Sequence, residues 1–312
     1  MLFGMMGLII VVFIILTFNR VKIWKDDFTL WNDAVEKNPK GDAPIANRGY
    51  ASLTIGQWEN AINDFSKVIE MNPTFKSVYS NRGIAYEKTG QWEKAIEDFT
   101  KAIEINSNDF DAYAGRGVCH GILGQLDKSI IDFSRAIQIN PTNKQVYSNR
   151  GHTYASLGDL DKAIADYSKA IELDPEFTDA YSNRSIAYAK LNQWDKAIAD
   201  VDNLIKVDPG NARNYDKSGY YYLGKADLDH AGDQFRKCIK LDEKSFDALL
   251  GLAVISYYNG DLVNVKTNLD QAKNLEPKLY NGMSGIYELE NMGWFKPATT
   301  KEILKKMFEV IK

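Results

Sequence analysis

The sequence predicts an all-α fold of the solenoid type, in which helical hairpins stack one on the next. The first observation is a 34-residue phrase, clearest at residues 142–175, that occurs seven times between residue 42 and Pro277. The second is an apolar stripe at helical spacing, formed by Ala163, Ile164, Tyr167, Ala170 and Ile171. The third is a pair of helix breakers, Gly158 between the two helices and Pro175 after them. Because one hairpin cannot bury its apolar face alone, neighbouring hairpins must stack.

The phrase resembles the tetratricopeptide repeat, a family that pairs two antiparallel helices, here called helix A and helix B, in each repeat. The residues that carry the resemblance in the clearest copy are Tyr147, Gly151, Tyr154, Ala163, Tyr167, Ala170 and Pro175. The resemblance implies a right-handed α-solenoid of tetratricopeptide helical hairpins. We number its seven repeats from one to seven across residues 42–277.

The composition of the chain and the motifs that it lacks argue against several classes of function. The 312 residues carry a net charge of −4, which argues against sequence-blind binding of nucleic acid. Cys119 and Cys238 lie in different repeats, so the sequence has no disulfide framework. No histidine has a second ligand at metal spacing, and no phosphate-binding loop or nucleophile elbow is present. We therefore expect a protein that is not an enzyme, with no cofactor, no metal and no small-molecule substrate.

Residues 1–18 form an apolar run without any charged side chain, which predicts one transmembrane helix before the repeats. At about 1.5 Å per residue the run would span about 27 Å, close to the thickness of a hydrocarbon core. The alternative is a cleaved signal peptide, which would have a basic start and small residues at its cleavage site. Arg20, Lys22 and Lys25 follow the run, and the positive-inside rule then places the repeats in the cytoplasm.

Residues 19–41 carry the helix B pattern without a helix A, because Trp31 and Ala34 fall in register with Tyr167 and Ala170. We therefore predict a juxtamembrane half repeat. A membrane helix followed by such a half repeat is similar to the junction in membrane glycosyltransferases of the O-mannosyltransferase type. In that family the repeats face away from the cytoplasm, so the side of the membrane stays open. The resemblance implies an alternative function, a non-catalytic portion or accessory of a membrane glycosyltransferase system.

Residues 278–312 are expected to form capping helices that cover the end of the repeat array. Thr299 and Glu302 form a capping box at the start of the last helix. The apolar stripe of this helix consists of Ile303, Leu304, Met307, Phe308 and Ile311. The alternative interpretation of the stripe is a dimerisation helix.

Two residue series change together along the repeats. Helix A of the first five repeats carries an arginine, at Arg48, Arg82, Arg116, Arg150 and Arg184. Helix B of the same repeats carries an aspartate, at Asp64, Asp98, Asp132, Asp166 and Asp200. Repeats six and seven lose both residues together, which predicts contact between the two positions. Because a guanidinium can bind a carboxylate through two hydrogen bonds, we expect a structural ladder; the alternative is an exposed basic stripe for an acidic partner.

Asparagines precede four of these arginines, at Asn47, Asn81, Asn149 and Asn183. In tetratricopeptide repeats this face of helix A lines the concave groove, and similar ladders in the O-GlcNAc transferase repeats hold a peptide backbone. An amide suits that role because it donates and accepts hydrogen bonds, and so pairs with any peptide unit. We expect a protein-interaction scaffold that binds an extended peptide or a partner helix. The alternative is that asparagine merely tolerates a solvated helix face.

A second candidate site resembles the carboxylate clamp of chaperone-binding repeats. Its residues are His152, Asn183, Arg213 and Lys217, which would bind an anion through two cations and an amide. The clamp also requires a lysine and an asparagine on its first helix, where this chain has Ser148 and His152. A co-chaperone that binds a C-terminal carboxylate is therefore a further alternative.

Overall fold

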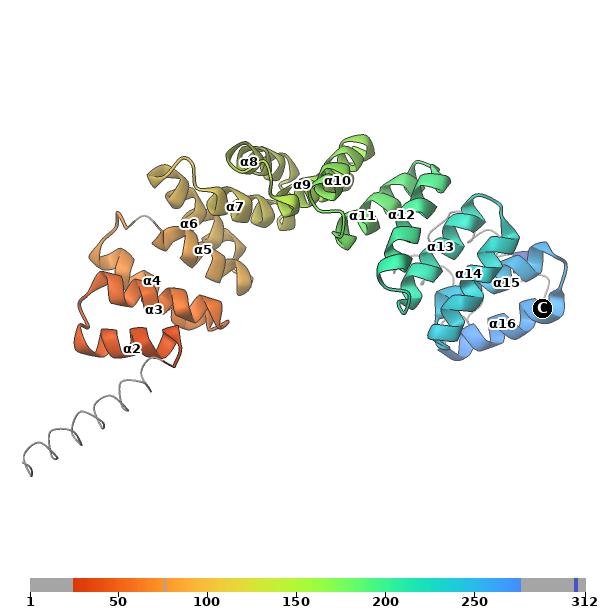
Figure 1. Ribbon diagram of the computed structural model, residues 1–312, viewed down its shortest axis with the longest axis horizontal. Coiled ribbons are helices and arrows are strands. Elements are labelled where there is room, and N and C mark those ends of the chain that lie inside the picture. Colours follow the sequence, from red (N-terminus) through yellow and green to blue (C-terminus); the bar gives the residue numbers. More distant parts are fainter. Residues whose placement is uncertain (1–24, 76, 276–305, 308–312) are drawn as a thin grey trace, which may run out of the picture. The chain divides into compact units, whose positions relative to one another are not determined.

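The computed structural model describes residues 25–75, 77–275 and 306–307, which form fifteen α-helices and no strand (Figure 1). The predicted all-α fold is therefore confirmed. The chain divides into two compact units, Met1–Thr153 and Tyr154–Lys312, and each is described by itself.

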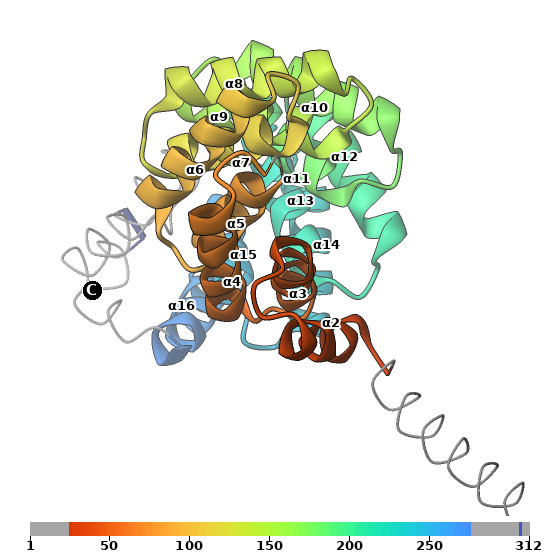
Figure 2. The same cartoon turned by 90° about the vertical axis from the view of Figure 1, so that its left-hand side faces the viewer.

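Within its described residues, unit 1 begins with a single helix, which three full hairpins follow. Its helices are α2 (Asp27–Lys37), α3 (Asp42–Thr54), α4 (Trp58–Met71), α5 (Val78–Lys88), α6 (Trp92–Ile105), α7 (Phe110–Ile122) and α8 (Leu126–Ile139). Each helix packs against the next one along the chain, as the second view of the ribbon shows (Figure 2). The first helices of neighbouring hairpins also contact each other, α3 with α5 and α5 with α7.

Unit 2 continues the same pattern, after α9 (Lys144–Leu157), which crosses the boundary between the units. Its further helices are α10 (Leu160–Leu173), α11 (Thr178–Lys190), α12 (Trp194–Val207), α13 (Ala212–Gly224), α14 (Leu228–Leu241), α15 (Phe246–Tyr258) and α16 (Leu262–Leu275). From α10 onward each helix packs against the next, and α13 also contacts α15. Odd-numbered helices from α3 to α15 are thus helix A, and even-numbered helices from α4 to α16 are helix B.

The turn from helix A to helix B passes through the left-handed region of backbone conformation, which favours glycine. Five repeats place glycine there, at Gly56, Gly90, Gly124, Gly158 and Gly260. Repeats five and six instead use Asn192, with φ 57°, and Ala226, with φ 63°. Asparagine tolerates this conformation, whereas alanine has no side chain that stabilises it.

Helix α2, whose sequence has the helix B pattern, packs on α3. The repeat register would start it at residue 24, but it begins at Asp27, because Asp26 and Thr29 form a reciprocal capping box. Val35 packs against the apolar cluster that contains Ile45 and Phe65. Helix α2 therefore helps to cover the core of the first full hairpin.

The core consists of one aromatic or aliphatic side chain per helix B together with small residues of both helices. The largest buried side chains at this position are Phe65, Phe99, Phe133, Tyr167 and Phe235. They stand at the same place in their repeats, as expected for an apolar stripe with a 34-residue period.

Two predicted elements fall mostly outside the described residues. The expected transmembrane helix at residues 1–18 lies outside them, and none of the described helices is long and apolar enough to cross a membrane. Of the expected C-terminal capping stripe, only Met307 is described. It is fully buried in a cluster with Leu250, Val254 and Leu269, so it covers the apolar face of the last hairpin.

Candidate functional site

The helix A face of unit 1 carries side-chain amides that are free to bind. Asn47 on α3 and Asn81 on α5 are each half-buried. Neither side-chain amide makes a hydrogen bond with any residue that the structure describes. Because α3 and α5 contact each other, the two amides lie on adjacent helices. This arrangement presents a donor and an acceptor to solvent from each repeat.

The other two predicted groove residues have the same degree of burial. Asn149 on α9 accepts a hydrogen bond from Gln145, at 3.1 Å between Nε2 and Oδ1. Asn183 lies in unit 2, on α11, and its amide makes no hydrogen bond with a described residue. Three of the four predicted amides are thus without a partner in the described chain.

An aromatic ring lies close to the backbone where the asparagine series is interrupted, at Gly115. A β-carbon added at Gly115 would lie 2.4 Å from Cζ of Phe99 in the preceding repeat. The equivalent rings of Phe65 and Phe133 precede Asn81 and Asn149, so the ring in this place does not by itself exclude an asparagine. Gly251 has the same relation to Phe235, at 2.4 Å.

Apolar side chains lie one helical turn beyond the amides. Tyr50 and Ile186 are exposed, and Ile84 and Val118 are half-buried. Each follows its amide position by three residues, so the two kinds of side chain share one face of helix A. The face combines hydrogen-bonding groups with apolar surface, as an extended peptide requires.

Arginine and aspartate form bidentate pairs in four repeats. Arg116 Nε donates to Asp132 Oδ2 at 2.9 Å, and Arg116 Nη2 donates to Asp132 Oδ1 at 2.7 Å. The same geometry joins Arg48 to Asp64, Arg82 to Asp98 and Arg184 to Asp200. The aspartates are buried and the arginines are mostly covered, so these side chains brace the helices and leave little basic surface.

The arginines also join each repeat to the one before it, a role that our sequence reasoning missed. The third guanidinium nitrogen, Nη1, donates to a hydroxyl or amide oxygen on the preceding helix B. These acceptors are Asn32, Ser66, Thr100, Ser134 and Ser168. They recur at the 34-residue period, so the sequence contained the signal. In the described geometry Arg150 has this contact with Ser134.

Hydrogen bonding and burial each shift the pKa values of the paired side chains. The hydrogen bonds to Asp64 raise the pKa of Arg48, and those to Asp200 raise the pKa of Arg184. Burial raises the pKa of Asp98, although Arg82 opposes this shift. A buried pair of this kind becomes costly when one member is removed, because the other charge is left in a site of low polarity.

Repeat six breaks the ladder and leaves polar atoms unsatisfied. Ser218 replaces the arginine and Gln234 replaces the aspartate. Ser218 Oγ and Gln234 Oε1 are buried and have no hydrogen-bond partner among the described residues. These neutral residues remove the charges but do not restore the hydrogen bonds.

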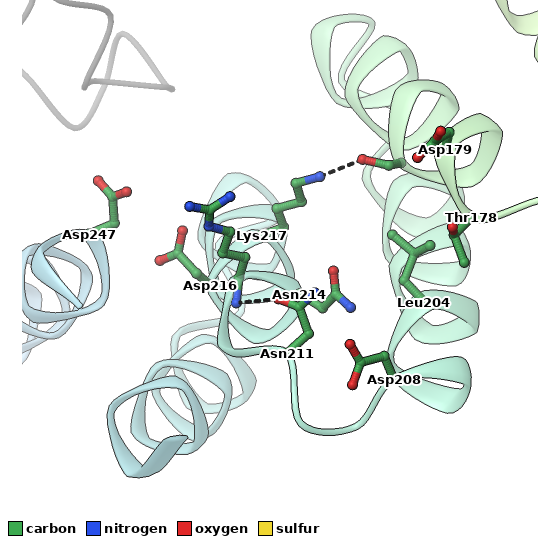
Figure 3. A pocket seen from close by; sticks show the side chains of 11 residues that line it. Thr178, Asp179, Leu204, Asp208, Asn211, Asn214, Asp216, Lys217 and Asp247 are labelled. Carbon is green, nitrogen blue, oxygen red and sulfur yellow. Dashed lines mark hydrogen bonds between the residues drawn. The ribbon is translucent and has the colours of Figure 1, made fainter. Parts of the chain in front are cut away.

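Two residues of the predicted anion site, Arg213 and Lys217, line a common pocket. Arg213 and Lys217 line one pocket of about 730 Å³ in unit 2, but Asn183 is not part of its lining (Figure 3). His152 is exposed and belongs to unit 1. Lys217 Nζ donates to Ser182 Oγ at 2.6 Å. The pocket also contains four carboxylates, from Asp179, Asp208, Asp216 and Asp247, which outnumber the two cations.

Catalytic chemistry finds little support in the described geometry. Burial raises the pKa of Cys119 to about 12 and that of Cys238 to about 11, so neither thiol forms a nucleophilic thiolate at neutral pH. Burial also lowers the pKa of His120. No group of His, Cys, Asp and Glu within the described ranges has the arrangement of a metal site.

Comparison with known families identifies the repeats. Models described as tetratricopeptide repeat match residues 77–109, 110–143, 145–177, 167–199 and 212–245. A further model, described as TPR repeat, matches residues 49–90. Together these segments cover more than half of the chain. No curated protein sequence matches it.

Solved structures of repeat proteins share the fold. YrrB, described as a TPR protein with an unusual peptide-binding site, has 23% identity and a TM-score of 0.54, over 59% of this chain and 95% of YrrB. A tetratricopeptide repeat protein from Parabacteroides merdae has 17% identity and a TM-score of 0.57, over 86% of this chain and 98% of its own. MamA has 24% identity and a TM-score of 0.52, over 54% of this chain and 92% of MamA. At these identities the likeness establishes the fold alone.

Proposed function

Because the chain belongs to the tetratricopeptide repeat family, we propose that it is an interaction scaffold whose helix A face binds an extended peptide. In unit 1 the binding groups are the amides of Asn47, Asn81 and Asn149, and in unit 2 the amide of Asn183. The observation that carries the proposal is that Asn47, Asn81 and Asn183 have half-buried amides without a partner in the described chain. Each such amide can satisfy one peptide N–H and one peptide C=O. YrrB, which shares the fold, is described as having a peptide-binding site.

The side chains around the amides indicate how such a peptide would be held. Hydrogen bonds to the backbone do not depend on the ligand's sequence, so affinity for many peptides is expected from the amides alone. The apolar side chains of Tyr50, Ile84 and Val118 lie beside them and would add selectivity for apolar ligand residues.

The test is the retention of a degenerate nonapeptide pool, blocked at both ends, by the immobilised full chain. Blocked ends remove the terminal carboxylate, so retention cannot arise from a carboxylate clamp. The double change Asn47→Ala and Asn81→Ala should lower retention at least about thirtyfold, because at least two hydrogen bonds are lost and each net hydrogen bond is worth about 1 kcal/mol. The control is Asn63→Ala, an exposed amide on the helix B α4. Equal retention by the wild type and the double variant would contradict the proposal.

We also propose that residues 1–18 anchor the scaffold in a membrane as a single span. The support is the uncharged apolar run of the sequence, followed by Arg20, Lys22 and Lys25. The full chain should stay in the membrane fraction after carbonate extraction, and a chain that starts at residue 19 should be released. Release of both chains would overturn the anchor. The glycosyltransferase and co-chaperone alternatives stay predictions from the sequence.

A further inference from the structure

Repeat six departs from the other repeats at a buried position of helix A. Its third helix A residue is Asn214, and the equivalent residues of the other repeats are Pro44, Val78, Ala112, Val146, Ala180 and Ala248. Asn214 is only 8% exposed, yet its side-chain amide makes no hydrogen bond with any described residue. Its amide atoms do not belong to the buried side-chain atoms without a hydrogen-bond partner, so they still reach the surface of the molecule and can bind a group from outside the chain.

The Asn214 amide points into the pocket of unit 2 that contains Arg213 and Lys217 (Figure 3). Leu204 of helix α12 and Asp208, the residue after this helix, lie on the side of the pocket toward which the amide is directed. Its volume of about 730 Å³ lies within the range of about 300–1,000 Å³ that is usual for ligand pockets. The amide is therefore a preformed polar group at a site with room for a ligand.

The charge of the pocket selects the class of ligand. Asp179 and Asp247 lie on opposite sides of the pocket, and Asp208 and Asp216 complete a set of four carboxylates (Figure 3). Asp179 makes no hydrogen bond or ion pair with a described residue. The pocket also contains two cations, Arg213 and Lys217, and the hydrogen bond of Lys217 to the neutral Ser182 hydroxyl leaves its charge in place. Because the four carboxylates outnumber the two cations, a positively charged ligand is favoured over an anion in this pocket.

We propose that this pocket binds the side chain of an arginine in a peptide held on the helix A face. The inference rests on the proposed function, because Asp216 and Lys217 belong to the same helix A stretch as the amide series. A guanidinium is planar and carries five N–H donors, so it can bind acceptors that converge from several helices. The acceptors that line this pocket include the Asn214 amide oxygen on α13, the Asp179 carboxylate on α11 and the Asp208 carboxylate just after α12. Lysine offers three donors from one point and suits such a set less well.

The experiment compares two probes, N-acetyl-arginine methylamide and its neutral citrulline counterpart, by saturation-transfer NMR on the full chain. The arginine probe should bind at least about tenfold more tightly, the ratio expected when one charge-assisted hydrogen bond is lost. Asn214→Ala and Asp179→Asn should each reduce this preference to near one. Alanine stands at this position in three other repeats, so the Asn214→Ala variant is expected to fold. The matched control is Asp111→Asn, at the equivalent position of repeat three and outside the pocket.

Equal binding of the two probes to the wild type would overturn the inference, as would an equal effect of Asp111→Asn and Asp179→Asn. A second measurement uses nonapeptide pools whose central residue is fixed as arginine or citrulline. Preferential retention of the arginine pool is expected. If the small arginine probe binds but the arginine pool is not preferred, the pocket takes a free small molecule and not a residue of a peptide, which would refute the peptide assignment. The failures are distinguishable, because the Asn47→Ala and Asn81→Ala changes lie in unit 1 and leave this pocket intact.

Discussion

Replacing Asp132 by alanine tests the role of the Arg–Asp pairs most directly. The change removes both oxygens that accept hydrogen bonds from Arg116, at 2.9 Å and 2.7 Å, and leaves the helical backbone unchanged. The Asp132 side chain is 4% exposed and that of Arg116 is 19% exposed, so water can replace the lost carboxylate only in part. Breaking a buried pair by removing one partner costs about 3–5 kcal/mol. Because Arg116 keeps its 3.0 Å bond to Thr100, we expect about 3 kcal/mol, at the lower end of that range.

Urea unfolding followed by circular dichroism measures this loss, and hydrogen exchange of α7 and α8 locates it. The double change Arg116→Ser with Asp132→Gln reproduces the residues of repeat six, Ser218 and Gln234. It removes the stranded charge, so it should be less destabilising than the sum of its single changes, with a coupling energy above about 1 kcal/mol. The control is Glu104→Gln, which breaks an exposed ion pair with Lys101 and should cost below about 1 kcal/mol. If Asp132→Ala costs no more than the control, the pairs do not brace the repeats.

Two further changes test the packing and the turns by urea unfolding. Gly115→Ala should destabilise by about 1–3 kcal/mol, because its β-carbon would lie 2.4 Å from the Phe99 ring, whereas Gly121→Ala on the same helix should be nearly neutral. Ala226→Gly should stabilise by about 1 kcal/mol, because φ is 63° there; Gly124→Ala, at the same turn position in repeat three, should lose a similar amount. No change in either Gly115→Ala or Ala226→Gly would contradict the corresponding argument.

The repeat period made the fold predictable from the sequence. Side chains that recur every 34 residues must occupy equivalent places in their repeats. The apolar stripe that includes Tyr167 and Ala170 therefore predicted a buried stripe on every helix B. Comparison of repeats also directed attention to the Arg and Asp positions, since both change together in repeat six. The structure brings these two residues into bidentate contact in four repeats.

The contents of the pocket were not predictable in the same way. Sequence comparison selected Arg213 and Lys217 as an anion site, because their positions match those of a clamp. It could not show that Asp179, Asp208 and Asp247 converge on the same space, since they come from separate helices. Convergence depends on the angle at which hairpins stack, and no single repeat encodes that angle.

Repeat six contains two kinds of polar side chain at positions where other repeats differ, and the two kinds have different physical explanations. Ser218 and Gln234 replace an Arg–Asp pair, and their unsatisfied atoms belong to the two helices of one hairpin. Asn214 replaces an apolar residue that other repeats retain, and its amide faces a pocket that can receive a ligand. Loss of the Arg–Asp pair accounts for the first kind, because Ser218 and Gln234 stand at the positions of that pair. It does not account for the second, because Asn214 belongs to neither the arginine nor the aspartate series. The proposed arginine ligand gives the Asn214 amide a hydrogen-bond partner, which the described chain does not supply.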